Sequence, residues 1–350
     1  MQHMPKTHKE GSFCFRKNMV ITMAKAAIMA PGGWGTALGI LCVNNGLDTV
    51  IWGKFEEEIN RLRDSRETPL LKGVHIPESI LLTTNIEDVL DADYIIMSTP
   101  SFAVRETANR LCGKIKSGAV IISVSKGFER DTLKRFTEVI AEELPDNAVV
   151  ALSGPSHAEE VALGMPTSIV AASTNMEAAK SVQQALMCDS FRIYTNEDVI
   201  GVEIGAALKN IIAMAAGVCD GMGLGDNTIA ALMTRGIHEI SRLGVKMGAN
   251  VHTFAGLSGI GDLIVTCTSR HSRNRRFGKL LGEGMAIDDA LKQVGMTVES
   301  YYATAAAKQL ADKYGVEMPI VSECYDMLYC GGKAQEKIKA LMNRSMKSEI

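Results

Sequence analysis

A single lysine, Lys209, lies in the otherwise apolar stretch Glu203–Gly217, whose hydrophobic pattern has the period of a helix. Apart from Glu203 and Asn210, its neighbours in that stretch are apolar or small. A lysine on a buried helix must pair its charge or release its proton, because burial disfavours the charged form. Buried lysines are readily tuned for acid–base work. We therefore expect Lys209 to transfer a proton, the alternative being a lysine at a helix edge whose ammonium reaches water.

A second signal is the glycine-rich segment Ala30–Ala37 (APGGWGTA), which joins a short apolar run to a predicted helix. Such a context is typical of a turn that binds the pyrophosphate of a dinucleotide at the helix N-terminus. Gly32 is expected to let the backbone approach the pyrophosphate, and Gly35 to let the helix pack closely on the strand. Ala30 replaces the first glycine of the G-x-G-x-x-G pattern. Alanine is tolerated there if the backbone avoids positive φ, in which case Ala30→Gly would cost some stability. A purely structural turn is the alternative.

The end of the second apolar run bears on the choice of cofactor. An acidic residue at that position holds the ribose 2′-hydroxyl of NAD. Here the run ends in Trp52-Gly53-Lys54, and the next acid in the sequence is Glu56. Lys54 therefore favours the 2′-phosphate of NADPH, with NADH still usable, although a solvated surface lysine would look the same.

Two segments that follow later apolar runs are candidates for a substrate site, namely Ser125–Glu129 and Gly154–Ala158. A lysine at the carboxyl end of a parallel strand faces the ligand crevice, which favours Lys126 as a substrate contact over a solvated loop lysine. His157 is a weaker candidate for a base than for a histidine at the rim of the crevice.

The last chemical cluster joins the glycine-rich turn Gly256–Asp262 to the polar segment Ser272–Arg275. An acid ten residues before Ser272-Arg273-Asn274-Arg275 fits a small phosphorylated polyol, because guanidinium groups match the geometry of phosphate oxygens. A solvated basic run is the alternative.

Short apolar runs alternate with helical stretches and must position these residues. Gly35–Asn45, Glu87–Ala92 and Arg105–Lys116 have a helical pattern. Continuous apolar strands between helices predict a doubly wound parallel sheet that is buried on both faces. The strand candidates are Ala26–Ala30, Asp48–Gly53, Tyr94–Thr99, Ala119–Ser125, Ala148–Leu152, Thr167–Ala172 and Phe191–Tyr194.

From about Val202 the helical period dominates, which predicts an all-helical second domain. We place the boundary near residues 195–203, with the α/β domain over residues 24–200 and the helical domain over residues 201–345. Residues 1–23 show no periodicity, so we expect a disordered extension or a start of translation at Met19 or Met23. The helical stretches are Glu203–Gly217, Thr228–Met247, Ala286–Val294, Val298–Tyr314 and Pro319–Tyr329.

Composition excludes several classes of protein. The 350 residues include 37 basic and 40 acidic side chains, a net charge of -3, and only 5% are aromatic. This argues against binding to nucleic acid or to an anionic membrane. The eight cysteines are dispersed without a C-x-x-C motif, which predicts reduced thiols and neither a disulfide scaffold nor a zinc site. No run of about 18 apolar residues is apparent, so we expect no membrane span.

Together these segments resemble the bacterial type of NAD(P)-dependent sn-glycerol-3-phosphate dehydrogenase. The resemblance extends from about Ala24 to Lys347. It is carried by GGWGTA (32–37), WGK (52–54), SKGFE (125–129), SGPSHAEEV (153–161), GAALKNIIAMAAG (205–217), GLSGIGDL (256–263), SRNRRFG (272–278), TVES (297–300) and GVEMPI (315–320).

The resemblance implies that residues 24–200 form a Rossmann-like NAD(P)-binding domain. It implies that residues 201–345 form a helical substrate-binding and catalytic domain like the C-terminal one of 6-phosphogluconate dehydrogenases, with a substrate cleft between the two. It implies reversible reduction of dihydroxyacetone phosphate by NADPH or NADH, with NADPH preferred. It also implies a cytoplasmic, homodimeric enzyme of phospholipid synthesis that needs no metal. It makes Lys209 the catalytic proton donor and acceptor. The implied substrate contacts are Lys126, Gly154, Ser156, Asp262, Ser272, Arg273 and Asn274. The implied cofactor contacts are Gly33, Trp34, Lys54, Lys126, Ala158, Arg273, Thr297 and Glu299.

Three positions depart from the family pattern. Ala30 stands for the first glycine, and Gly33 stands for the usual serine and so loses any side-chain contact. Lys54 replaces the usual arginine, which keeps the charge and loses the planar fork.

Two other functions are compatible with parts of the sequence. A dehydrogenase for another substrate, such as a 3-hydroxy acid, would also place a lysine in a helical domain but would have less need of Arg273. A nucleotide-sensing regulator without activity would keep the glycine turn and could lack Lys209.

Overall fold

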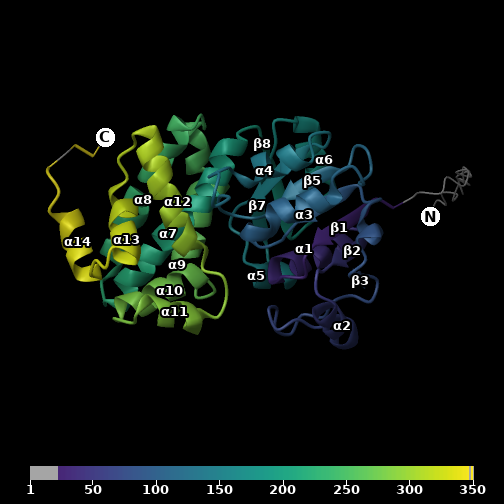
Figure 1. Cartoon of the computed structure of the whole chain (residues 1–350), viewed down its shortest axis with the longest axis horizontal. Coiled ribbons are helices and arrows are strands. Elements are labelled where there is room, and N and C mark those ends of the chain that lie inside the picture. The colour runs from purple at the N-terminus through teal and green to yellow at the C-terminus, as the bar shows by residue number, and fades with distance from the viewer. Residues whose placement is uncertain (1–22, 347, 350) are drawn as a thin grey trace, which may run out of the picture.

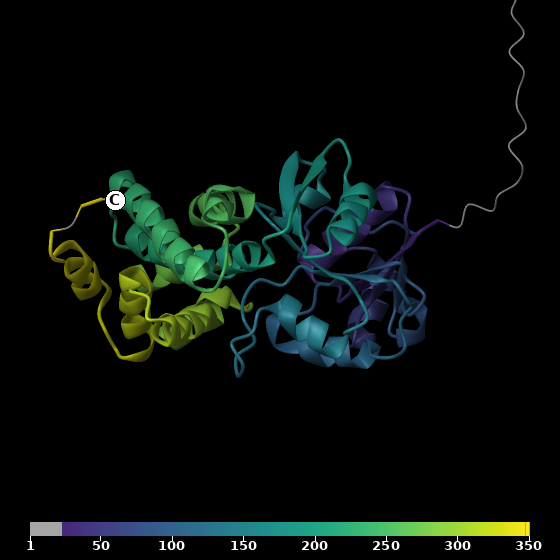
Figure 2. The same cartoon turned by 90° about the horizontal axis from the view of Figure 1, so that it is seen from above.

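The computed structural model describes residues 23–346 and 348–349, so the predictions for residues 1–22 lie outside it. All its strands lie between Lys25 and Asn196, and the chain is helical from Val199 onward. The sheet part and the helical part lie side by side in both views (Figures 1 and 2). The predicted α/β architecture, an N-terminal doubly wound sheet followed by a helical part, is confirmed.

The sheet has eight strands in the order β3-β2-β1-β4-β5-β6-β7-β8. The chain runs outward from β1 in one direction and then from β4 in the other, so the order reverses between β1 and β4, where α/β sheets bind ligands beyond the carboxyl ends of the strands. Neighbouring strands are parallel except β6 and β7, an exception to the predicted parallel sheet. The strands are β1 Lys25–Met29, β2 Asp48–Trp52, β3 Leu81–Thr83, β4 Tyr94–Met97, β5 Val120–Ser123, β6 Val149–Ser153, β7 Thr167–Ala172 and β8 Phe191–Asn196.

Both faces of the sheet are buried, as the continuous apolar strands predict. Ala27 and Ile28 are adjacent in β1, yet each is fully buried and each belongs to a different hydrophobic core. The covering helices are α1 Gly33–Asn44, α2 Glu56–Ser65, α3 Val104–Leu111, α4 Phe136–Glu143, α5 Ala158–Ala162 and α6 Met176–Leu186.

Some local predictions for the sheet part are wrong. Strand β3 was not predicted, because three residues are too few for a pattern. The predicted helix Glu87–Ala92 is a 3₁₀ turn, Ile86–Val89, and the predicted helix Arg105–Lys116 ends at Leu111. Gly113 follows that end in the left-handed conformation, with φ 68°, which stops a right-handed helix.

The helical part is built around α7, Val199–Gly221, which is buried over most of its length. Helix α10 crosses it closely, because a Cβ at Gly217 would lie 2.0 Å from the carbonyl oxygen of Arg275. The helices around α7 are α8 Asp226–Lys246, α9 Asp262–Thr268, α10 Arg273–Gly282, α11 Ile287–Val294, α12 Glu299–Tyr314, α13 Pro319–Tyr329 and α14 Ala334–Met342.

Helix α7 corrects the expectation that no stretch of the chain is apolar enough to span a membrane. By length and hydropathy it passes such a test, but 83% of the tested window is buried inside the molecule. An apolar helix surrounded by other helices is the core of a helical domain.

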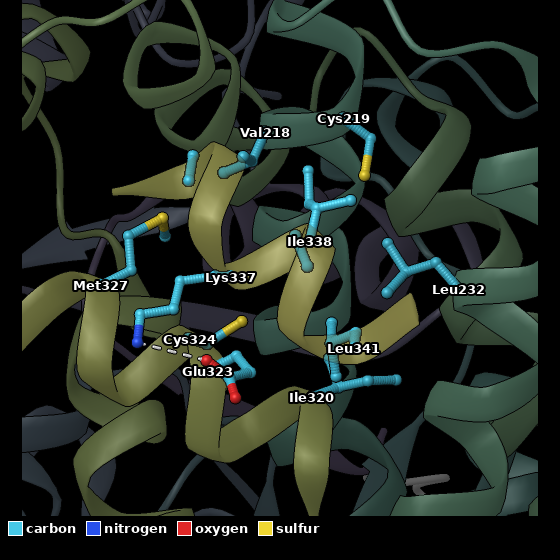
Figure 3. Close-up of a pocket in the computed structure, with 12 residues that line it drawn as sticks. Val218, Cys219, Leu232, Ile320, Glu323, Cys324, Met327, Lys337, Ile338 and Leu341 are labelled. Carbon is cyan, nitrogen blue, oxygen red and sulfur yellow. Dashed lines mark ion pairs between the residues drawn. The ribbon is translucent and has the colours of Figure 1, made fainter. Parts of the chain in front are cut away.

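The last helix, α14, has no buried residue. It covers a small apolar pocket formed with α7, α8 and α13 (Figure 3). Lys337 of α14 forms an ion pair with Glu323 at 3.3 Å and another with Asp326. This helix is therefore attached through its lysine and a few apolar side chains, away from the strand ends.

Candidate active site

Lys209 is the centre of a buried polar cluster on α7. Its side chain is almost fully buried, and its ammonium donates to the carboxylate of Asp262 and, at 2.7 Å, to the hydroxyl of Thr266. Asp262 begins α9 and Thr266 lies one turn later, so both face Lys209 from the helix packed beside it. Thr266 in turn donates to the backbone carbonyl of Asp262 at 2.6 Å. The alternative of a lysine that reaches water is wrong, and Thr266 is a contact that the sequence did not reveal.

The sheet part supplies a second lysine to the same carboxylate. Lys126, in the loop after β5, donates to Asp262 at 2.8 Å and to the backbone carbonyl of Gly154 at 3.2 Å. Ser156 donates to the same carbonyl at 3.0 Å. Asp262 is thus shared by two ammonium groups, one from each part of the molecule. Hydrogen bonds therefore join residues from four segments that were predicted separately, namely Lys126, Gly154 and Ser156, Lys209, and Asp262.

Burial changes the protonation of this cluster. It lowers the pKa of Lys209 to about 7, with the attraction of Asp262 opposing the shift and the charge of Lys126 adding to it. Burial and the nearby Lys209 also lower the pKa of His157, whose buried Nε2 has no hydrogen-bond partner in the described part of the chain. A lysine with a pKa near neutrality can both donate and accept a proton at physiological pH.

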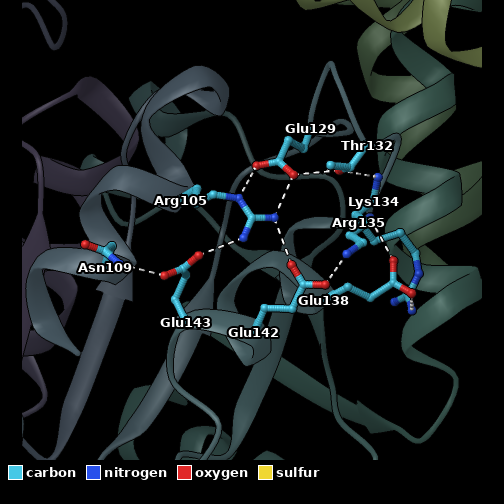
Figure 4. Close-up of polar contacts among 9 residues, drawn as sticks. All are labelled: Arg105, Asn109, Glu129, Thr132, Lys134, Arg135, Glu138, Glu142 and Glu143. Atoms are coloured by element: carbon cyan, nitrogen blue, oxygen red, sulfur yellow. Dashed lines mark hydrogen bonds and ion pairs between the residues drawn. The ribbon is translucent and has the colours of Figure 1, made fainter. Parts of the chain in front are cut away.

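The loop that carries Lys126 is anchored by two adjacent residues, Phe128 and Glu129. Phe128 leaves the sheet part and packs in the hydrophobic core of the helical part. Glu129 forms two hydrogen bonds of 2.7 Å with the guanidinium of Arg105, which also binds Glu142 and Glu143 (Figure 4). The three carboxylates raise the pKa of Arg105. This network fixes the backbone three residues from Lys126.

A second buried ion pair ties α7 to the sheet part. Glu203 of α7 accepts a hydrogen bond from Arg135 at 2.6 Å and one from the backbone amide of Thr137 at 3.0 Å, at the first turn of α4. Burial raises the pKa of Glu203, and Arg135 opposes that shift. The start of the helix that carries Lys209 is therefore anchored outside its own domain.

The glycine-rich turn brings the N-terminus of α1 close to the end of β1. A Cβ at Gly35 would lie 2.4 Å from the carbonyl oxygen of Ala30, which confirms that this glycine allows the close approach of α1 to β1. Gly32, the N-cap of α1, provides no side-chain cap, and the first turn contains no acid, so its N–H groups are available to an anion. Gly33 packs beside Leu70, and Trp34 is half-buried against the sheet core.

The backbone at Ala30 differs from the expectation. Its φ is 105°, in a region that favours glycine and that an alanine enters only with strain. The expectation that Ala30→Gly costs stability is therefore wrong in its premise. The turn directly after β1 therefore contains a strained alanine.

Lys54 has a partner that the sequence concealed. Its ammonium lies 2.9 Å from Glu106 of α3, a residue 52 positions further along the chain. The absence of an acid in the sequence directly after β2 therefore does not mean that no acid is present in space. No sequence signal indicated Glu106.

The segment predicted to bind the substrate phosphate forms the start of α10, and its side chains have different surroundings. Ser272 is the buried N-cap of this helix and accepts from the amide of Arg275. The side chain of Asn274 is buried and joins Asn210 to the amide of Ser300, each at 2.9 Å. Arg273 alone is exposed. Within the described residues, no hydrogen bond or ion pair connects Ser272, Arg273 or Asn274 to Lys209.

The remaining predicted contacts lie on either side of the junction. Glu299 of α12 accepts from Ser101 at 3.2 Å, and burial raises its pKa while the nearby Arg273 opposes the shift. Thr297 precedes α12 and is half-buried, as is Ala158, the first residue of α5. Glu299 thus connects the helical part to the segment after β4.

The chain is similar to known proteins of one family. The models for the N-terminus and the C-terminus of NAD-dependent glycerol-3-phosphate dehydrogenase match residues 25–179 and 198–339. The chain is 49% identical to a glycerol-3-phosphate dehydrogenase (NAD(P)+) of Clostridium perfringens, over 93% of this chain and 99% of that one. It is 48% identical to the protein of that name in Desulfitobacterium hafniense, over 94% of each.

A solved structure shares the fold. The glycerol-3-phosphate dehydrogenase of Coxiella burnetii superposes with a TM-score of 0.88 at 34% identity, over 92% of this chain and 99% of that one. The two family models between them account for both parts of the molecule, and the similarity spans nearly the whole described chain. This chain therefore belongs to the NAD-dependent glycerol-3-phosphate dehydrogenase family.

Proposed function

We propose that this protein reduces dihydroxyacetone phosphate reversibly to sn-glycerol 3-phosphate with a nicotinamide cofactor. The observation that carries the proposal is the buried ammonium of Lys209, which shares Asp262 with Lys126 at the junction of the two parts. Relatives of the same length bear the name of this activity.

The lysines would act on the carbonyl oxygen of the substrate. Reduction places negative charge on that oxygen, and Lys209 would donate the proton that neutralises it, or accept the proton in the reverse direction. Lys126 would add a second positive charge beside the oxygen, and Asp262 would hold both ammonium groups in place. Because Thr266 and Asp262 occupy donors of Lys209, its ammonium is already oriented before the substrate binds.

When bound, the cofactor supplies the hydride from its nicotinamide ring. The N-terminus of α1 would hold the pyrophosphate, and further contacts would come from Gly33, Trp34, Lys54, Lys126, Ala158, Arg273, Thr297 and Glu299. The substrate would contact Lys126, Gly154, Ser156, Asp262, Ser272, Arg273 and Asn274, with Arg273 as the exposed guanidinium for its phosphate. We further propose that NADPH is preferred, because Lys54 follows β2 where an acid would select NAD.

The biological setting is also a proposal. We infer a cytoplasmic homodimer that supplies the glycerophosphate backbone of phospholipids, as the resemblance implies. The described cysteines are all free, and Cys42, Cys219, Cys267 and Cys324 are buried, which agrees with a reducing compartment. Light scattering of the purified chain would test the dimer.

The decisive experiment is an assay of NADPH oxidation after dihydroxyacetone phosphate is added. Unphosphorylated dihydroxyacetone and a 3-oxo acid serve as competing substrates, and Lys209→Ala serves as the inactive control. Rapid oxidation with the phosphorylated ketone alone supports the proposal. A faster reaction with the 3-oxo acid would assign the other dehydrogenase function, and cofactor binding without any turnover would favour a nucleotide sensor.

A further inference from the structure

The environment of Lys54 contains a group that bears on cofactor choice. Glu106 accepts a hydrogen bond from Lys54 at 2.9 Å and one from Arg110 at 2.8 Å, both through the same carboxylate oxygen. Glu106 and Arg110 are one turn apart on α3, whereas Lys54 follows β2. All three side chains are about half exposed, so a ligand can reach each of them.

This cluster lies at the point where a dinucleotide fits. Strand β1 lies between β2 and β4 in the sheet, and α3 follows β4, so the contact from Lys54 to Glu106 joins segments on either side of β1. The glycine-rich turn leaves the end of β1, and a Cβ at Gly53 would lie 3.3 Å from Pro31 of that turn. Glu106 is therefore an acid at the end of β2 in space, where an acid holds the ribose 2′-hydroxyl of NAD.

The charges of the cluster oppose one another. Two cations share one carboxylate, which leaves a single net positive charge for an incoming anion. A 2′-phosphate carries between about one and a half and two negative charges at neutral pH. It must compete with Glu106 for both cations and is repelled by the carboxylate itself. A 2′-hydroxyl brings no charge and can donate a hydrogen bond to Glu106. The two cations also lower the pKa of Glu106, Lys54 most strongly through its hydrogen bond, so this carboxylate is ionised at neutral pH.

We propose that Glu106 sets the cofactor selectivity of this enzyme by competing with the 2′-phosphate of NADPH for Lys54 and Arg110 and by accepting the 2′-hydroxyl of NADH. Glu106 thereby weakens the preference for NADPH that Lys54 alone would create. The inference rests on the proposed function only in that the cofactor is a nicotinamide dinucleotide.

The test is equilibrium binding to the full chain without any ketone. Dissociation constants for NADPH, NADH, 2′,5′-ADP and 5′-AMP are measured by calorimetry for the parent, Glu106→Gln and Glu177→Gln. Glu177 pairs with Lys180 on α6 and provides the same loss of charge at an unrelated surface. We expect Glu106→Gln to raise the ratio of NADPH to NADH affinity by about five- to tenfold at low salt, and less at 0.5 M salt.

The adenosine fragments separate the source of the effect. 2′,5′-ADP should gain affinity in Glu106→Gln, 5′-AMP should lose affinity or stay unchanged, and Glu177→Gln should match the parent. The inference would be overturned if affinity changed equally for ligands with and without a 2′-phosphate, or if Glu177→Gln shifted the affinities as much as Glu106→Gln does. A chain that bound both cofactors with these ratios but failed to reduce dihydroxyacetone phosphate would refute the proposed function and leave Glu106 in its role.

Discussion

Lys209 and Lys54 each contact a carboxylate, but Lys209 is buried whereas Lys54 is exposed to solvent. Lys209 is 5% exposed and shares Asp262 with another lysine. Lys54 has a side chain that is 47% exposed and faces Glu106, which is itself 53% exposed. Water screens the second pair and not the first, so the same type of ion pair has different chemical consequences at the two places.

Burial changes the protonation of Lys209, whereas the exposed ion pair of Lys54 keeps two hydrated charges that can change partners. Desolvation disfavours the ammonium of Lys209 strongly enough to bring its pKa close to neutrality. Around Lys54 the ions remain hydrated, so exchange of partners costs little. We therefore propose that the buried pair carries the chemistry and that the exposed pair sets the choice between NADPH and NADH.

The largest effect expected from this comparison is the loss of the buried amine. Lys209→Ala should lower kcat by a factor of roughly 10²–10⁴, the usual worth of general acid catalysis. Cofactor affinity should change little, because the amine lies among Asp262 and Thr266 and not at the glycine-rich turn. Steady-state kinetics and calorimetry on the same preparation test both statements. Near-normal turnover would remove Lys209 from the mechanism.

Substitution of Arg273 tests whether an exposed guanidinium contributes to binding of the doubly charged phosphate of the substrate. A charged hydrogen bond contributes roughly 1.5–3 kcal/mol, so Arg273→Ala should raise KM for dihydroxyacetone phosphate about ten- to hundredfold and lower kcat as well. Arg273→Lys should restore only part of the loss, because it lacks the planar fork.

Unphosphorylated dihydroxyacetone is the control for Arg273. Its low rate with the parent enzyme should hardly respond to Arg273→Ala. Equal losses for both ketones would show that Arg273 serves the cofactor or the fold.

The pH dependence should reveal the buried lysine directly. Reduction needs protonated Lys209, so kcat/KM for the ketone should fall roughly tenfold per pH unit above a pKa of about 7. Oxidation of glycerol 3-phosphate needs the neutral amine, so its rate should rise with pH up to the same value. Asp262→Asn removes the charge that raises this pKa, and both limbs should move to lower pH. Limbs that stay in place would mean that another group titrates.

The exposed pair predicts a smaller effect that salt can suppress. Lys54→Asp should shift the ratio of kcat/KM toward NADH by roughly tenfold at low ionic strength, because the new carboxylate repels a 2′-phosphate and can hold a ribose hydroxyl. The shift should shrink at 0.5 M salt. A ratio that does not change with the substitution would place Lys54 away from the cofactor.

The smallest effect is expected at Ala30, where neither pair is involved. Ala30→Gly removes the strain of a φ of 105° and also adds conformational entropy to the unfolded chain. We expect the relief of strain to be the larger effect, so the free energy of unfolding should rise by about 1 kcal/mol. Ala26→Gly in the preceding strand, β1, is the matched control and should destabilise the protein. Thermal and urea unfolding measure both variants. A loss of stability in Ala30→Gly would show that the turn tolerates alanine without strain.

Local patterns determined most of the architecture. Seven strands follow from continuous apolar runs, because strands in a sheet that is covered on both faces bury the side chains of both faces. The main helices of the second part follow from apolar residues that recur with the helical period. The isolated polar residue in an apolar helix identified Lys209 for the same reason. Sequence patterns also located Lys126, Gly154 and Asp262 separately, each at the end of an element.

Tertiary structure alone decided which of these groups meet. Asp262 contacts lysines 53 and 136 positions away, and Lys54 meets an acid 52 positions away. No local pattern encodes such distances, because they depend on how the sheet order and the packing of α9 on α7 bring distant segments together. The φ of Ala30 is likewise imposed by the approach of α1 to β1, since a turn's conformation is set by the elements that it joins.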